Sequence, residues 1–122
     1  MKKVLVVEDS RTDAAIIEDL LKREGIDVQI AANAEEGFNK AILLEPDMII
    51  VDLILPGMNG FELCRRLRNE DRLRKAIILV WSSKDNMEDI NEAFRCGADD
   101  YVIKPPLPEF LARKIKIYLG IK

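Results

Sequence analysis

The 122-residue sequence contains no histidine. This absence excludes serine–histidine and cysteine–histidine nucleophile pairs, most zinc sites, and a phosphohistidine on this chain. Any chemistry must therefore come from carboxylates, hydroxyl groups, lysines and a metal ion that prefers oxygen ligands.

Cysteine and long apolar runs are also scarce. The only cysteines, Cys64 and Cys96, form no C-x-x-C motif, so we expect no disulfide framework and a reduced, cytoplasmic setting. No apolar run approaches the roughly 18–20 residues that a membrane span needs. The run that follows Met1 is too short for a signal peptide. The sequence therefore predicts no membrane partner.

Neither sign of charge dominates. The net charge is −3, with 34% charged and 48% hydrophobic residues, which is typical of a globular domain. A slightly acidic chain is a poor match for a nucleic-acid surface, so we expect no direct nucleic-acid binding. The length suits one domain, and no linker or internal repeat divides the chain, so residues 1–122 are interpreted as one domain without an output domain.

Short apolar runs alternate five times with helical patterns. This alternation predicts an α/β fold, with a doubly wound parallel sheet and helices on both faces. The expected strands are 3–7, 27–31, 48–51, 76–81 and 101–103. The expected helix starts are Ser10 with Asp13, Asn33 with Glu36, Asn59 with Glu62, Asp85 with Glu88, and Pro108.

Apolar residues at helical spacing predict which side of each helix is buried. Trp81, at the end of an apolar strand, is interpreted as core packing. The expected buried residues are Ile16, Ile17, Leu20 and Leu21; Phe38, Ala41 and Ile42; Phe61, Cys64 and Leu67; Ile90, Ala93 and Phe94; and Phe110, Leu111, Ile115 and Tyr118.

Four of the five strands run directly into polar residues. Each residue has an ordinary explanation by itself, as a helix cap, a turn former or a solvated lysine. The carboxyl ends of parallel strands meet at one edge of a sheet, however, so we expect these residues to converge. They are Glu8, Asp9, Asp52, Ser82 and Lys104.

The converging residue types point to phosphoryl chemistry. Three neighbouring carboxylates repel one another unless a cation lies between them. A donor set of oxygens alone favours Mg²⁺ or Mn²⁺ over zinc. With a lysine ammonium and a hydroxyl group opposite, the set forms a cage for a phosphoryl group, and the central Asp52 is the natural nucleophile.

At this point the sequence resembles the receiver domain of bacterial response regulators, the CheY-like family of two-component signalling. The resemblance covers essentially the whole chain, and it implies five parallel strands in the order 2-1-3-4-5 with five helices. The matching motifs are Glu8-Asp9, Asp52 with Pro56-Gly57, Gly60, Ser82, Gly97-Ala98-Asp99-Asp100-Tyr101, and Lys104-Pro105.

The resemblance implies a role for each site residue. Asp52 would accept a phosphoryl group from the phosphohistidine of a sensor histidine kinase or a histidine phosphotransfer protein, or from acetyl phosphate. Lys104 would pair with the phosphate, and the Lys104–Pro105 peptide bond is expected to be cis. Mg²⁺ would be held by Glu8, Asp9, Asp52 and the backbone carbonyl of Ile54.

The resemblance also implies a switch. Ser82 would turn towards the phosphate and Tyr101 would follow from an exposed to a buried rotamer, which remodels the face of the fourth helix, fifth strand and fifth helix for an output partner. The domain would be a monomer or a phosphorylation-linked dimer. Ile54 and Lys84 would set the lifetime of the phosphorylated state. Pro106 stands where an aromatic residue is common.

Two alternatives remain. One is a receiver-like docking module that is never phosphorylated. The other is an aspartate-nucleophile phosphatase of the haloacid dehalogenase type, which needs a second acid two residues after the nucleophile, where this chain has Ile54. The preferred interpretation is not an enzyme beyond self-phosphorylation from phosphodonors and self-dephosphorylation.

Overall fold

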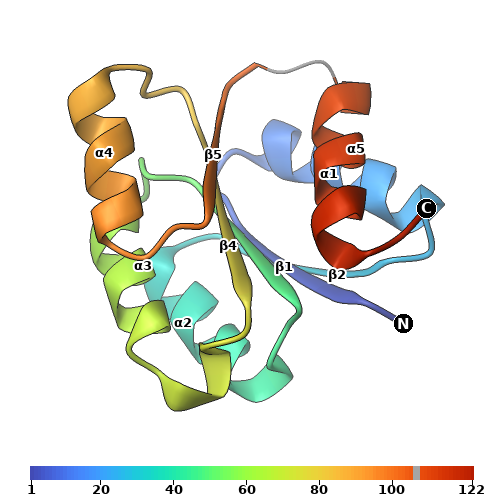
Figure 1. Cartoon of the computed structure of the whole chain (residues 1–122), viewed down its shortest axis with the longest axis horizontal. Helices are drawn as coiled ribbons and strands as arrows, with labels where there is room; N and C mark the ends of the chain where they lie inside the picture. Colours follow the sequence, from blue (N-terminus) through green and yellow to red (C-terminus); the bar gives the residue numbers. More distant parts are fainter. Residues whose placement is uncertain (106–107) are drawn as a thin grey trace.

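Five parallel strands form one sheet in the order β2-β1-β3-β4-β5, which confirms the expected architecture (Figure 1). The structure is a computed structural model and describes residues 1–105 and 108–122. The expectation for Pro106 therefore lies outside the described residues.

Strands and helices alternate along the chain as the apolar patterns predict. The edge strand β2 is the more exposed one expected for 27–31, whereas all four residues of β3 are buried. The elements are β1 (Lys3–Val7), α1 (Arg11–Arg23), β2 (Asp27–Ala31), α2 (Ala34–Leu44), β3 (Met48–Val51), α3 (Gly60–Arg68), a 3-10 turn (Asp71–Leu73), β4 (Ile77–Ser82), α4 (Met87–Arg95), β5 (Asp100–Ile103) and α5 (Pro108–Leu119).

Each face of the sheet has its own hydrophobic core. Leu5 and Val7 of β1 join one core, and the alternating residues Val4 and Val6 join the other. Helices α2, α3 and α4 cover the first face, whereas α1 and α5 cover the second (Figure 1). The two-sided cover explains why the central strands are apolar throughout.

Side-chain caps begin the first three helices where the sequence predicts them. The side-chain oxygens of Ser10, Asn33 and Asn59 each accept a hydrogen bond from the backbone N–H three residues ahead. These caps satisfy N–H groups that have no partner within the helix. They also begin α1 and α3 directly after the segments that carry the acidic residues.

The predicted start of α4 was wrong by one residue. The cap is Asn86, not Asp85: Asn86 Oδ1 accepts from Asp89 N at 2.8 Å, and its Nδ2 donates to the Asp89 carboxylate at 2.7 Å. Asn86 makes both bonds because its amide carries an acceptor and a donor, whereas an ionised aspartate only accepts.

Four residues expected to be buried lie on the surface. Ile16, Phe94, Phe110 and Tyr118 are 45%, 44%, 53% and 37% exposed. In α1 and α5 the buried stripe follows positions three or four apart, so residues next to the stripe point partly outward. The observed stripes are Ala14, Ile17 and Leu21 in α1, Ala93 in α4, and Leu111, Ile115 and Leu119 in α5.

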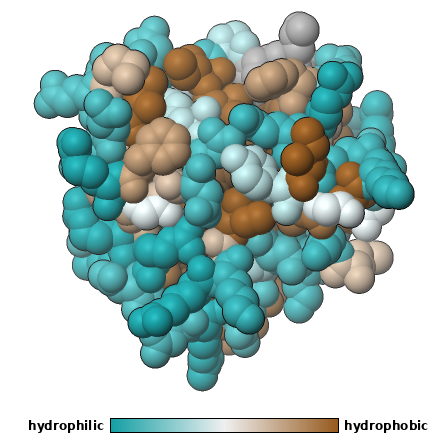
Figure 2. All heavy atoms as spheres, viewed as in Figure 1, coloured by the Kyte–Doolittle hydropathy of each residue, from teal (hydrophilic) through white to brown (hydrophobic). Residues whose placement is uncertain are grey.

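One face of the molecule carries mostly polar side chains. Hydrophilic side chains dominate the face seen in Figure 2, with hydrophobic ones interspersed among them. Among residues 1–105 and 108–122, no helix has both the length and the apolar character to cross a membrane.

Candidate phosphoryl-transfer site

Strand register brings the site together at the carboxyl edge of the sheet. Val7 of β1 pairs with Val51 of β3, so the residues that follow, Glu8 and Asp52, leave the sheet side by side. The Asp52 N–H donates to the Val7 carbonyl at 3.1 Å, which ties the two strand ends together.

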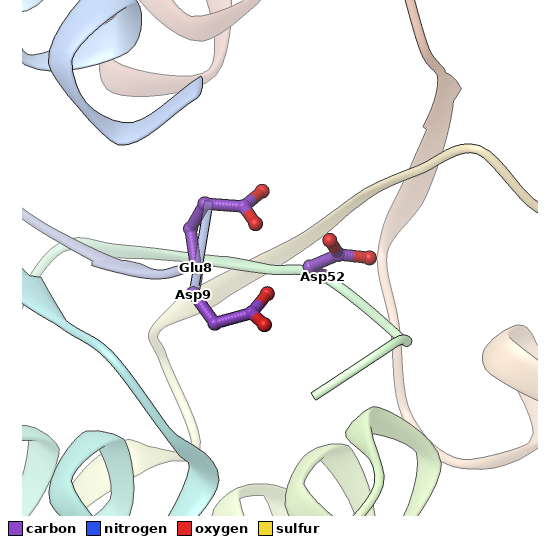
Figure 3. Close-up of side chains that lie close together, drawn as sticks. All are labelled: Glu8, Asp9 and Asp52. Atoms are coloured by element: carbon purple, nitrogen blue, oxygen red, sulfur yellow. The ribbon is translucent and has the colours of Figure 1, made fainter. Parts of the chain in front are cut away.

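Three carboxylates converge at this edge. Glu8, Asp9 and Asp52 each offer an oxygen, and these oxygens lie within 4.8 Å of one another (Figure 3). Glu8 and Asp52 are 2% and 7% exposed, whereas Asp9 is exposed. Buried carboxylates need a cation or hydrogen-bond donors to offset the cost of desolvation.

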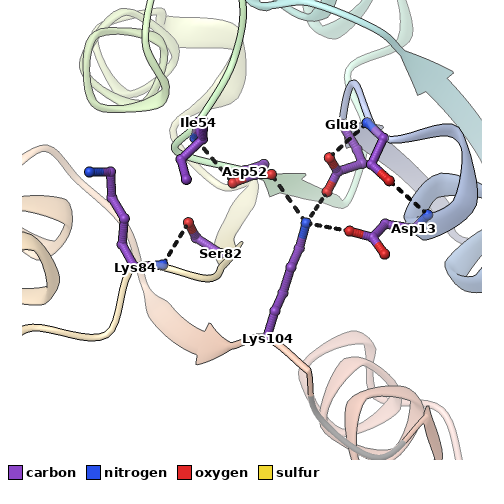
Figure 4. A network of polar contacts seen from close by, with 8 residues as sticks. Glu8, Asp13, Asp52, Ile54, Ser82, Lys84 and Lys104 are labelled. Atoms are coloured by element: carbon purple, nitrogen blue, oxygen red, sulfur yellow. Dashed lines mark hydrogen bonds and ion pairs between the residues drawn. The ribbon is translucent and has the colours of Figure 1, made fainter.

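Lys104, which directly follows β5, supplies a positive charge to the site. Its Nζ donates to Glu8 Oε1 at 2.5 Å, to Asp13 Oδ2 at 2.8 Å and to Asp52 Oδ2 at 3.1 Å (Figure 4). The Lys104 N–H donates to the carbonyl of Ser82, and the Lys104–Pro105 peptide bond is cis. All three ammonium protons are used, and the surrounding carboxylates raise the pKa of Lys104 above its ordinary value.

The donor set fits Mg²⁺ or Mn²⁺. Within the described residues, the three clustered carboxylates supply oxygen ligands alone, which suits a hard cation that retains some of its water. The cluster carries more negative charge than Lys104 neutralises, so a divalent cation would relieve the repulsion.

Burial shifts the pKa of Glu8. Desolvation raises the pKa of Glu8 from 4.5 to about 7, although Lys104 and the N–H of Ser10 lower it, and the charge of Asp52 raises it further. Glu8 therefore holds a proton in the metal-free folded protein at pH values where the unfolded chain has released it.

We expect the metal-free protein to become less stable as pH rises towards about 7. Between pH 4.5 and about 7 the folded state holds one proton more at Glu8 than the unfolded state, so the free energy of unfolding falls with rising pH. Urea denaturation across this pH range, with a chelator present, measures the slope. Glu8→Gln should flatten it, and an equal slope in that variant would contradict the assignment.

The residues expected to form the switch meet at Lys84. The Lys84 N–H donates to Ser82 Oγ at 3.4 Å, and the Tyr101 hydroxyl donates to the Lys84 carbonyl at 2.6 Å. Ser82 is fully buried and Tyr101 is half-buried against the core. Burial raises the pKa of the Tyr101 hydroxyl. The switch residues are therefore linked through one backbone position.

Ile54, two residues after Asp52, contacts the Asp52 carboxylate through its backbone. The Ile54 N–H donates to Asp52 Oδ1 at 3.1 Å, and the Ile54 side chain is 52% exposed (Figure 4). These contacts do not involve the Ile54 carbonyl, so its role as a metal ligand stays a prediction.

Sequence reasoning missed Asp13. It was assigned only to the cap of α1, yet its carboxylate contacts Lys104. The signal was its place in the first turn of a helix that begins at the carboxyl edge. Helical spacing alone does not reveal that Lys104, 91 residues away, reaches that turn.

Comparisons with known proteins agree with this geometry. Residues 4–116 match the family model of the response regulator receiver domain. The transcriptional regulatory protein AfsQ1 of Streptomyces coelicolor is 38% identical over 98% of this chain and 52% of its own length. The alkaline phosphatase synthesis transcriptional regulatory protein PhoP of Bacillus subtilis is 36% identical over 97% and 48%. The chain thus spans about half the length of these curated relatives.

Solved structures show the same fold. The chemotaxis response regulator CheY4 of Vibrio cholerae superposes with a TM-score of 0.91 at 30% identity, over 97% of this chain and 98% of its own. A two-component response regulator of Clostridium difficile gives 0.92 at 28% identity, over 98% and 97%. The chain therefore belongs to the response regulator receiver domain family.

Proposed function

We propose that residues 1–122 act as a phosphoryl-accepting domain in a two-component pathway, with Asp52 as the acceptor. The donor would be the phosphohistidine of a sensor histidine kinase or a histidine phosphotransfer protein. The observation that carries the proposal is the placement of Asp52, 7% exposed, between two further carboxylates and the ammonium group of Lys104. A signalling domain of this kind works in the cytoplasm.

The transfer needs little covalent chemistry from the protein. An Asp52 carboxylate oxygen attacks phosphorus, the bond from phosphorus to the donor nitrogen breaks, and the electron pair stays on the donor imidazole. A bound Mg²⁺ would supply neutralising charge at the reacting oxygens. Glu8 and Asp9 would hold the cation together with Asp52 and the carbonyl of Ile54.

Lys104 and Ser82 then receive the new charge. A phosphoryl group adds about −1.5 to −2 charges, and its oxygens accept hydrogen bonds. Lys104 releases its bonds to Asp52 and Glu8 and pairs with the phosphoryl oxygens. The Ser82 hydroxyl turns from the N–H of Lys84 towards the same oxygens.

The turn of Ser82 reaches the output face through Lys84. Ser82 and Tyr101 both bond to the backbone of Lys84, so a shift of this residue frees Tyr101 to move further inward. The face of α4, β5 and α5 changes with it and meets the output partner.

Asp99 and Asp100 already make contacts within the domain. Asp99 Oδ2 accepts from Arg68 and from the N–H of Ile78, each at 2.8 Å. Asp100 Oδ2 contacts Lys114 at 2.7 Å and accepts from Tyr118 at 2.6 Å. These intramolecular pairs favour the monomer before phosphorylation and limit the acidic groups available to a phosphorylation-linked dimer.

Acetyl phosphate with Mg²⁺ tests the proposal. We expect the intact mass of the protein to rise by one phosphoryl group, and Asp52→Asn to remove this gain because the acceptor oxygen is lost. Asp71→Asn, at a surface residue whose side chain is 86% exposed, is the matched control and should leave the gain unchanged. Absence of an adduct would favour the docking module, and turnover of phosphate esters would favour the phosphatase.

We also expect slow self-dephosphorylation. An apolar side chain at position 54 cannot orient an attacking water by hydrogen bonding, and Ile54 stands beside the acceptor (Figure 4). Ile54→Asn should shorten the lifetime of the adduct, measured as loss of the added mass after the phosphodonor is removed. Decay within seconds in the unchanged protein, or equal lifetimes in both proteins, would contradict this expectation.

A further inference from the structure

Asp13 is the one carboxylate on Lys104 that lies outside the acidic cluster. Glu8 and Asp52 belong to the cluster that would hold the cation, whereas Asp13 comes from the first turn of α1. Its carboxylate accepts from Lys104 Nζ at 2.8 Å, and its side chain is 33% exposed (Figure 4). A cation bound by the cluster would therefore draw on two of the three acceptors of Lys104, whereas Asp13 lies outside its ligand set.

Local structure holds Asp13 in position. The Asp13 N–H donates to Ser10 Oγ at 3.3 Å, which orders the first turn of α1. Negative charge in the first turn is favoured by the helix dipole. Asp13 therefore faces Lys104 from the ordered first turn of α1.

The other side of Lys104 is apolar. Its ammonium lies 4.6 Å from the centre of the Trp81 ring, and Trp81 is 5% exposed. A small cavity of about 110 Å³ beside it is lined by Asp13, Ile16, Leu20, Trp81, Lys104, Pro105 and Leu111. These walls restrict the lysine, so its ammonium is shared between Asp13 and whatever occupies the acceptor site.

The charge of Asp13 acts on both ligands of the site. Asp13 Oδ2 and Asp52 Oδ2 are at most 5.9 Å apart, because they lie 2.8 and 3.1 Å from the same nitrogen. At this distance a second anion attracts a divalent cation and repels an incoming phosphoryl group. Asp13 also accepts a hydrogen bond that Lys104 would otherwise donate to a phosphoryl oxygen.

We propose that Asp13 is a positioning residue that competes with the phosphoryl group for Lys104, strengthens divalent cation binding and opposes phosphorylation of Asp52. The inference rests on the proposed function. It differs from a purely structural role because it requires changes of opposite sign at the two steps.

The test compares Asp13→Asn with two controls. Asp13→Glu retains the charge. Asp19→Asn makes the same charge change on α1, but at an outward residue 62% exposed and paired with Arg23. Calorimetric titration with Mg²⁺ alone measures cation affinity before phosphorylation, and intact mass measures the rate of phosphorylation by acetyl phosphate at saturating Mg²⁺.

For Asp13→Asn we expect the Mg²⁺ dissociation constant to rise about fivefold and the phosphorylation rate to rise about threefold. Asp13→Glu and Asp19→Asn should stay close to the unchanged protein in both measurements. Weakening of both steps in Asp13→Asn would indicate lost structure and overturn the inference, as would no change in either.

The two proposals fail in different ways. If the unchanged protein takes up a phosphoryl group but Asp13→Asn lacks the opposite shifts, the competition fails and the proposed function stands. If the unchanged protein takes up no phosphoryl group, both are overturned.

Discussion

Replacing Lys104 by methionine is expected to lower the free energy of unfolding of the metal-free protein by about 3 kcal/mol at about pH 8. The methionine retains most of the apolar stem beside Trp81 but removes the charge that Glu8 and Asp52 contact. These carboxylates are almost fully buried, and a buried charge that loses its partner costs far more than an exposed one. Urea denaturation with a chelator present measures the loss.

Two further measurements sharpen this prediction. Saturating Mg²⁺ should recover much of the loss, because a cation that binds only the folded state replaces the missing charge. Lowering the pH should also recover part of it, because a protonated Glu8 leaves no buried charge without a partner.

Lys22→Met is the matched control for Lys104→Met. Lys22 pairs with Glu18 on the surface of α1, where both side chains are more than a third exposed. Such a pair contributes roughly 0.5 kcal/mol at most. Equal stabilities of the two variants would show that the buried pairs of Lys104 contribute no more than a surface pair.

Replacing Gly60 by alanine is expected to lower the free energy of unfolding by about 3 kcal/mol or more and to displace Asp52. A Cβ at Gly60 would lie within 3.0 Å of the carbonyl oxygen of Asp52 and the Cα of Leu53. Both are backbone atoms, so relief requires movement of the segment that carries Asp52. The Gly60 N–H also donates to the Leu53 carbonyl at 3.1 Å, a bond this movement would strain.

The helix position itself does not require glycine at residue 60. Ala34 occupies the same first position in α2, directly after an asparagine cap. Gly25→Ala is the control: it has open space around it, and its φ of +75° gives a backbone cost of about 1 kcal/mol. Urea denaturation and calorimetric Mg²⁺ titration report both effects. The prediction fails if Gly60→Ala matches Gly25→Ala in stability and the unchanged protein in Mg²⁺ affinity.

The fold class follows from the sequence because its signals are local. Apolar runs of strand length alternate with helical patterns, and the caps Ser10, Asn33 and Asn59 begin helices where expected. The convergence of Glu8, Asp9, Asp52 and Lys104 also follows, because parallel strands place their carboxyl ends at one edge.

Details that depend on helix rotation could not be derived from the sequence. Ile16 and Phe110 fit an apolar stripe by spacing, yet both are about half exposed, because the direction of a helix face is set by packing against the sheet. The start of α4 depends on whether Asn86 or Asp85 finds donor and acceptor partners in the loop.

Sequence and tertiary structure determine different parts of the site. The sequence by itself determined the α/β fold through its alternating apolar patterns. It also determined the acidic edge with Asp52 and the lysine opposite, because these residues follow strand ends. Only the tertiary structure decided that Asp13 shares Lys104 with Asp52 and that Gly60 packs against the backbone of Asp52 and Leu53. Such contacts depend on the ångström-scale placement of two elements far apart in the chain, which neither periodicity nor residue type encodes.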